Sequence, residues 1–174
     1  ALRGEHNLYN VLAACAISLA ADLDKEAANR GIAGFAGVKH RLELVRELNG
    51  VRWYNDSIAT TPERTLAALN SFDEPIVLLL GGRDKHLPWD ELSFAVHQKV
   101  AHVVLFGEAA DLIGTALGTP RPGDRLSSIE RVANLKEALE RTRQIVQPGD
   151  VVLLAPGGTS FDEFKDFEDR GEFF

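Results

Sequence analysis

The sequence predicts an α/β fold, in which a short helical segment precedes a doubly wound, mostly parallel, Rossmann-like sheet with helices on both faces. Unbroken apolar runs at residues 75–80, 103–107 and 151–155 have the length and character of central strands that are buried on both faces. A segment with a helical pattern follows each run. Strand, crossover helix and strand in series imply parallel strands joined by right-handed crossovers.

The N-terminal stretch is helical in pattern. Apolar residues recur there at steps of three and four, the spacing of one helix face: Leu8, Val11, Leu12, Cys15 and Leu19. We expect Cys15 to pack on this face rather than to act as a nucleophile. A second helix is expected at residues 25–32, and the pattern changes after Gly37. The sequence therefore predicts a helical segment over residues 1–37 and an α/β domain over residues 38–174.

The α/β domain is expected to begin with a β-hairpin. Asn49-Gly50, the strongest short hairpin signal, separates an apolar stretch near residues 42–45 from Val51 and Trp53. A weaker strand should lie near residues 125–129, because the gap between the last two strong strands is about twice the earlier one. Helices are expected at residues 90–100, 109–117, 135–146 and 160–168.

Composition narrows the class of protein. With 174 residues, of which 45% are hydrophobic and 26% charged, the chain can bury a sizeable core. No apolar run approaches the roughly 20 residues needed to span a bilayer, and no signal peptide is recognisable, so we expect a cytoplasmic protein without a membrane partner. The formal charge of −7 argues against a nucleic-acid partner. Methionine is absent, even at position 1, which suggests a piece of a longer protein.

Four polar or glycine-containing segments follow the predicted strands, and ligands of such sheets bind at the carboxyl ends of the strands. They are residues 55–62, 81–85, 107–108 and 155–160. Thr61 and Pro62 have the chemistry of a helix N-cap and first helical residue. Two interpretations stay open for Asp56, Ser57 and Thr60, namely ligand contact or turn chemistry.

Lys85 and Ser160 are further candidates for contact with an anion. Lys85 could meet a carboxylate or phosphate as a compact charge, or it could lie in a solvated loop. Ser160 is placed to cap the last helix and to offer that helix N-terminus to a carboxylate.

Several common sites are missing from the sequence. The glycine spacing at residues 155–160 is not that of a dinucleotide fingerprint, and the five histidines are scattered without metal-ligand spacing. No G-x-x-x-x-G-K-[ST] loop occurs. If the chain handles ATP, it supplies only part of that site.

Five stretches, in order along the chain, resemble motifs of the Mur ligases, and in particular of their D-glutamate-adding branch. They are G-E-H-N-L-Y-N-V-L-A-A at residues 4–14, K-H-R-L-E at 39–43, N-D-S-I-A-T-T-P at 55–62, L-G-G-R-D-K at 80–85, and L-A-P-G-G-T-S-F-D-E-F at 154–164 together with F-E-D-R-G at 167–171. Each stretch alone is a weak signal, but five in family order are a strong one.

The resemblance implies a C-terminal fragment of a three-domain ligase of peptidoglycan synthesis. Such enzymes use ATP and Mg²⁺ to form an acyl phosphate on a UDP-sugar peptide precursor, UDP-N-acetylmuramoyl-L-alanine, which the amine of D-glutamate then attacks. Residues 1–37 would be the helical tail of the central ATPase domain, and residues 38–174 the C-terminal ligase domain. The N-terminal and central domains would be partners within the same chain. The fragment alone would be inactive and would supply no metal ligand.

The resemblance also implies roles for single residues. Those near the nucleotide would be Asn7, Asn10, Arg41 and Asp56. Those forming the D-glutamate pocket would be Thr60, Lys85, Ser160, Phe161 and Phe167. One residue departs from the motif, because Ile58 stands where the commonest form has lysine. Two alternatives remain: a stand-alone Rossmann-like nucleotide-binding module, and a Mur ligase that adds another amino acid.

Overall fold

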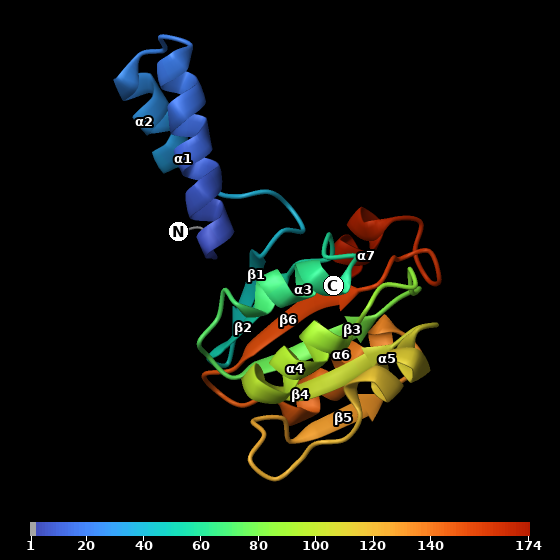
Figure 1. The fold of residues 1–174 in the computed structure, drawn as a ribbon. Coiled ribbons are helices and arrows are strands. Elements are labelled where there is room, and N and C mark those ends of the chain that lie inside the picture. The colour runs from blue at the N-terminus through green and yellow to red at the C-terminus, as the bar shows by residue number, and fades with distance from the viewer. Residues whose placement is uncertain (1–2) are drawn as a thin grey trace. The chain divides into compact units, whose positions relative to one another are not determined.

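The computed structural model describes residues 3–174 (Figure 1). The chain divides into two compact units, Ala1–Val38 and Lys39–Phe174. The assignment of the first unit to a central ATPase domain stays a prediction.

The first unit contains the two expected helices, α1 at Glu5–Ala20 and α2 at Lys25–Gly34. α2 begins after Asp24, whose carboxylate accepts a hydrogen bond from the Ala27 N–H at 2.7 Å, an N-cap of the usual kind. Cys15 is only partly buried, so its predicted burial on the helix face is not seen within this chain.

The second unit is built on a six-stranded sheet with the order β1-β2-β6-β3-β4-β5. The strands are β1 Glu43–Leu48, β2 Val51–Asn55, β3 Ile76–Gly81, β4 Val100–Phe106, β5 Ser128–Arg131 and β6 Val151–Gly157. All neighbours are parallel except β1 and β2, which form the expected antiparallel hairpin. The weak strand β5 starts three residues later than the sequence suggested. The predicted fold class is confirmed.

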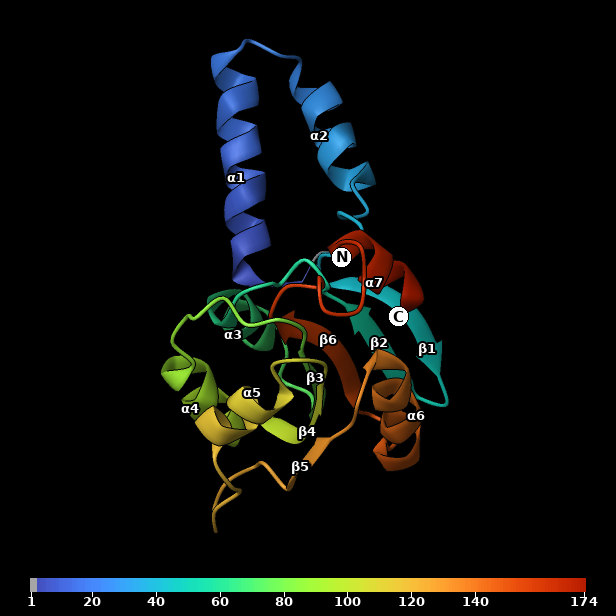
Figure 2. The ribbon, with the colours of Figure 1, turned by 90° about the vertical axis from the view of Figure 1, so that its right-hand side faces the viewer.

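Helices cover both faces of this sheet (Figure 2). Along β3, Ile76, Leu78 and Leu80 join the core under α3 Pro62–Leu69, α4 Asp90–Lys99 and α5 Ala110–Leu117. The alternate residues Val77 and Leu79 join the core under α6 Leu135–Ile145. Both faces of the central strands are therefore buried, which is why their sequences are apolar without alternation.

The hairpin turn follows from its two residues. Asn49 and Gly50 have φ values of 53° and 77°. Positive φ at both central positions defines the type I′ turn that matches the twist of a two-residue hairpin, and Asn-Gly is its preferred sequence.

The last helix lies elsewhere than predicted. We expected it at residues 160–168 with Ser160 as its cap, but α7 spans Phe167–Phe173. Asp166 is the N-cap, and its carboxylate accepts from the Asp169 N–H at 2.8 Å. Ser160 instead begins a turn, in which its carbonyl accepts from the N–H groups of Glu163 and Phe164.

No helix in the part of the chain that the structure describes is long and apolar enough to cross a membrane.

Gly50→Ala should destabilise the second unit by about 1 to 2 kcal/mol, because alanine tolerates the left-handed region poorly. The new Cβ would also lie 3.3 Å from Cβ of Pro148. Urea unfolding followed by fluorescence tests this, since both tryptophans, Trp53 and Trp89, lie in this unit. Gly31→Ala in α2, where a Cβ meets open space, is the control and should leave the transition in place.

Candidate active site at the carboxyl edge of the sheet

The loops that follow β2, β6, β3 and β4 lie side by side, as their strands do. The Asp56 N–H donates to the Leu154 carbonyl at 2.8 Å, which joins the β2 loop to β6. Arg83 and Thr159 exchange backbone hydrogen bonds of 2.9 and 2.8 Å, which joins the β3 loop to the β6 loop. The Ala109 N–H donates to the Gly82 carbonyl, so the loop after β4 is attached as well. The four predicted segments therefore form one edge.

A buried arginine of α7 joins that helix to two of these loops. Arg170 has no exposed surface. Its guanidinium donates to the hydroxyl and the carbonyl of Ser57, and to the carbonyls of Gly158 and Thr159, at 2.9 to 3.2 Å. Burial lowers the pKa of Arg170 to about 10, while Asp162 and Glu163 act in the opposite direction. The side chain thus stays charged at neutral pH and clamps the β2 loop, the β6 loop and α7.

Asn55 and Ser57 serve the same framework. The Asn55 amide donates to the Gly171 carbonyl at 3.0 Å, and its oxygen accepts from the Ser57 N–H at 3.0 Å. The Ser57 hydroxyl donates to the Phe167 carbonyl at 2.8 Å. Of the two interpretations left open for Ser57, turn and framework chemistry fits, because this hydroxyl is buried and already bonded.

Asp56 has a different environment. The Leu42 N–H donates to one of its oxygens at 3.0 Å, and no other described residue bonds to its carboxylate. Burial raises its pKa to about 6, against the effects of that hydrogen bond and of Arg41 and Arg64. The charge of Arg41 thus acts on Asp56, and the assignment of both residues to a nucleotide stays a prediction.

Thr60 and Lys85 come together from different loops. The Lys85 ammonium donates to the Thr60 hydroxyl at 3.1 Å, across 25 positions of sequence. Ser160, on the neighbouring β6 loop, is buried, and its hydroxyl bonds to no other described residue. Thr61 caps α3 as expected, accepting from the Arg64 N–H. The loops after β2, β3 and β6 therefore offer a ligand the ammonium group of Lys85 and the hydroxyls of Thr60 and Ser160.

The aromatic candidates differ in exposure. Phe161 is 61% exposed, whereas Phe167 is partly buried and meets the ring of His40 edge-on. Asn7 and Asn10 lie on α1 of the other unit, where the Asn7 amide donates to the Arg3 carbonyl at 2.6 Å. Whether these two asparagines share a ligand with Arg41 and Asp56 stays a prediction.

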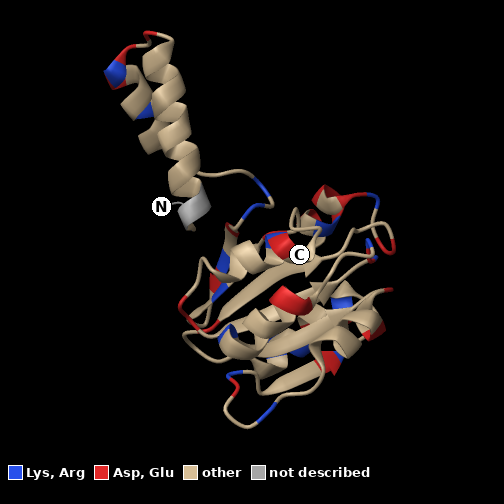
Figure 3. Cartoon of the chain, viewed as in Figure 1, with Lys and Arg blue, Asp and Glu red and all other residues tan. Residues whose placement is uncertain are grey.

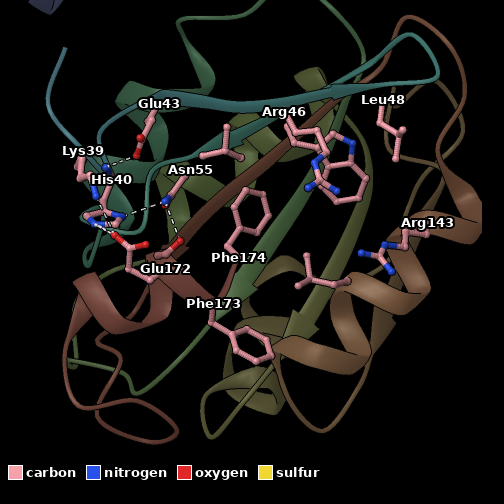
Figure 4. Close-up of a pocket in the computed structure, with 14 residues that line it drawn as sticks. Lys39, His40, Glu43, Arg46, Leu48, Asn55, Arg143, Glu172, Phe173 and Phe174 are labelled. Atoms are coloured by element: carbon pink, nitrogen blue, oxygen red, sulfur yellow. Dashed lines mark hydrogen bonds and ion pairs between the residues drawn. The ribbon is translucent and has the colours of Figure 1, made fainter. Parts of the chain in front are cut away.

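A cavity of about 420 Å³ lies elsewhere, along the β1–β2 hairpin beside α6 and α7 (Figure 4). At one end, Glu172 pairs with Lys39 at 3.1 Å, and His40 contacts Asn55. Arg143 stands at the other end. None of the candidate site residues lines this cavity.

Two further features bear on ligands. Acidic and basic residues are interspersed over the second unit (Figure 3), so a cation at the site acts locally. Among the described residues, no three His, Cys, Asp or Glu side chains gather as a metal-binding group.

Arg170→Met should lower the free energy of unfolding of the second unit by about 3 kcal/mol or more, because each buried acceptor left unpaired costs about 1 kcal/mol or more. Arg83→Met is the control: its guanidinium is half exposed and pairs with Glu108 at 2.9 Å, so the loss should stay within about 1 kcal/mol. Urea unfolding measures both. Equal effects for the two variants would contradict the clamp.

Because its pKa is raised, Asp56 should make the free energy of unfolding fall as pH rises, whereas a carboxylate with a lowered pKa has the opposite effect. The folded chain keeps this proton up to about pH 6, whereas the ordinary value is 3.8. The stabilisation is therefore complete below 3.8 and is lost as pH rises through 6. Relative to wild type, Asp56→Asn should gain about 1 to 3 kcal/mol between acid and neutral pH. Urea unfolding across this range tests it, with the exposed Asp73→Asn as a control whose curve parallels wild type.

The chain was compared with known proteins. Residues 40–158 match the family model described as Mur ligase, glutamate ligase domain. The UDP-N-acetylmuramoylalanine--D-glutamate ligases of Acetivibrio thermocellus and Symbiobacterium thermophilum are each 43% identical to the chain, over 98% and 99% of it. In both cases the match covers 37% of the relative, so the chain spans little more than a third of these curated relatives.

Solved structures agree on the fold. The UDP-N-acetylmuramate-alanine ligase MurC of Thermotoga maritima matches with a TM-score of 0.71 at 20% identity, over 99% of this chain and 37% of that one. The folylpolyglutamate synthase of Mycobacterium tuberculosis matches with a TM-score of 0.68 at 21% identity, over 90% of this chain and 38% of that one. The family model covers more than half of the chain, and the fold agrees with it. The chain therefore belongs to the Mur ligase family and contains its glutamate ligase domain.

Proposed function

We propose that this chain is the C-terminal part of a cytoplasmic, ATP-dependent ligase that adds D-glutamate to UDP-N-acetylmuramoyl-L-alanine during peptidoglycan synthesis. The names and identities of the curated relatives support this reaction. Because the chain spans 37% of those relatives, the missing N-terminal and central domains of the parent would supply the rest of the site. The fragment itself would not catalyse ligation, since it has no phosphate-cradling loop.

The observation that carries the proposal is the contact between Lys85 and Thr60 at the carboxyl edge. D-glutamate brings two carboxylates to a chain whose net charge is −7, so it needs a local cation and hydroxyl donors. Lys85, Thr60 and Ser160 offer these groups on adjacent loops. Phe161 and Phe167 would contact the methylene groups of the same amino acid.

Lys85 would contribute more to binding the carboxylates here than in the commonest form of the motif, which has a second lysine. Ile58 stands at the place of the common lysine, is only partly exposed, and brings no charge. In this chain the ammonium of Lys85 would therefore hold a D-glutamate carboxylate together with the hydroxyls. Its contact with Thr60 keeps that ammonium directed toward the β2 loop.

On the nucleotide side, we assign Arg41, Asp56, Asn7 and Asn10 to ATP. Asp56 fits a contact with ribose hydroxyls, because one carboxylate oxygen is held by the Leu42 N–H and the other bonds to no described residue. Arg41 fits the phosphates or the ribose, since no described carboxylate pairs with it. For Asn7 and Asn10 the assignment rests on the resemblance alone.

The chemistry divides accordingly. ATP with Mg²⁺ supplies the phosphoryl group that activates the carboxylate of the UDP-sugar peptide precursor. The residues of this chain bind and orient: Lys85, Thr60 and Ser160 fix the carboxylates of D-glutamate so that its amine faces the activated carboxyl. Such orientation lowers the entropic cost of bringing two substrates together.

Lys85→Ala in the full-length parent should raise the KM for D-glutamate by about tenfold or more, since a hydrogen bond to a charged group contributes about 1.5 to 3 kcal/mol. The KM values for ATP and for the UDP-linked substrate should change little. Lys99→Ala is the matched control, because Lys99 bonds to Asn70 on the surface.

The same assay, with D-aspartate, L-glutamate and L-lysine as competing amino acids, tests the substrate. Selective use of D-glutamate by the wild-type parent is expected. Preference for another amino acid would contradict the proposed reaction, and an unchanged KM in Lys85→Ala would contradict the role of Lys85.

A further inference from the structure

The loop that carries Lys85 contains an acidic residue to which the sequence assigned no role. Asp84 immediately precedes Lys85, and its side chain is only 11% exposed, whereas that of His86 is 94% exposed. A carboxylate withdrawn from solvent between two exposed neighbours must have hydrogen-bond donors of its own.

Both oxygens of Asp84 are engaged. One accepts the His86 N–H at 2.7 Å, two residues ahead, which closes an Asx turn and accompanies a left-handed His86 at φ 58°. The other accepts the indole N–H of Trp89 at 3.2 Å. The carboxylate thus fixes the loop on both sides of Lys85.

Trp89 links the turn at Asp84 to β6, which neighbours β3 in the sheet. Its side chain is buried. It packs so closely on Gly157, at the end of β6, that a Cβ there would come within 2.8 Å of the indole. Through this packing and its hydrogen bond, Trp89 links Asp84 to the end of β6, directly before the loop that carries Ser160.

The same contacts leave the positive charge of Lys85 available to an anionic ligand. Because the oxygens of Asp84 are held by N–H groups, this carboxylate forms no ion pair with the neighbouring ammonium among the described contacts. The ammonium is instead directed to Thr60. An ion pair with Asp84 would compete with an anionic substrate for Lys85.

We propose that Asp84 is a positioning residue for the acidic substrate: it orders the loop that presents Lys85 and keeps its own carboxylate away from that ammonium. This rests on the proposed function for its substrate, D-glutamate. Asp84 does not touch the substrate. It acts through Lys85.

The sign of the kinetic effect separates positioning from simple electrostatics. Asp84→Asn removes a negative charge beside the site, which alone would favour an anionic substrate and lower its KM. Positioning predicts the opposite, because the amide cannot accept from both N–H donors as the carboxylate does. Trp89→Phe keeps an aromatic ring against Gly157 but removes the donor, so it should act in the same direction.

The first experiment measures loop order without any substrate. Trypsin cleaves after Lys85, and the rate of cutting at Lys85-His86 in the 174-residue chain reports how often the loop opens. We expect Asp84→Asn and Trp89→Phe to be cut about fivefold faster or more, as expected when a hydrogen bond to a charged group is lost. Peptides of residues 80–90, with and without the Asp84→Asn exchange, correct for the preference of trypsin. Thermal unfolding followed by circular dichroism confirms that the variants fold.

The second experiment measures steady-state kinetics of the full-length parent. Both variants should raise the KM for D-glutamate severalfold and leave those for ATP and the UDP-linked substrate unchanged, with Asp73→Asn as control. Unchanged tryptic rates, a lowered KM for D-glutamate, or an equal rise for all three substrates would each overturn the positioning role. The wild-type parent decides the proposed function separately. If it did not use D-glutamate, that function would fail, and the tryptic rates alone would decide whether Asp84 orders the loop.

Discussion

The carboxyl edge of the sheet depends on one buried cation. Arg170 is fully enclosed and donates only to neutral oxygens, those of Ser57, Gly158 and Thr159. Removing a guanidinium from water is costly, and only a side chain with several fixed N–H donors can satisfy so many acceptors at once. These acceptors come from the loops after β2 and β6, and the donor from α7. The position of each part therefore depends on the other two.

The candidate site takes its geometry from this clamp. Ser57 lies three residues before Thr60, and Thr159 directly precedes Ser160, so the hydroxyls offered to a ligand are next to residues that Arg170 fixes. Asn55 extends the framework to the Gly171 carbonyl and to His40, near the start of the second unit. Preorganised groups are not reordered when a ligand binds, which lowers the entropic cost of binding. The candidate site residues range from the exposed Lys85 to the buried Ser160, whereas the side chains that support them, Arg170, Asn55 and Ser57, are all buried.

Local chemistry explains which features could be predicted from the sequence. β3, β4 and β6 are recognisable because burial on both faces requires continuous apolar sequence, and the hairpin because Asn-Gly fits a type I′ turn. The predicted start of α7 was wrong. Ser160 and Asp166 can both cap a helix, and the choice between them depends on contacts with residues distant in sequence. The sequence analysis included Arg170 only as part of the motif at residues 167–171 and did not predict its burial or its hydrogen bonds. The resemblance placed Lys85 and Thr60 in the same pocket. Their direct contact is seen only in the structure, because it joins residues of two different loops.

An acidic chain that binds an anion must keep its carboxylates from neutralising the binding cation. At this edge the acids are occupied by donors other than Lys85. Asp84 accepts from His86 and Trp89, and Asp162 accepts from the Glu108 N–H at 3.1 Å. Glu108 itself pairs with Arg83. Among the described contacts, these pairings leave Lys85 with a hydroxyl partner and no carboxylate. The net charge of −7 is thus compatible with anion binding, because local pairing determines which charges remain available to a ligand.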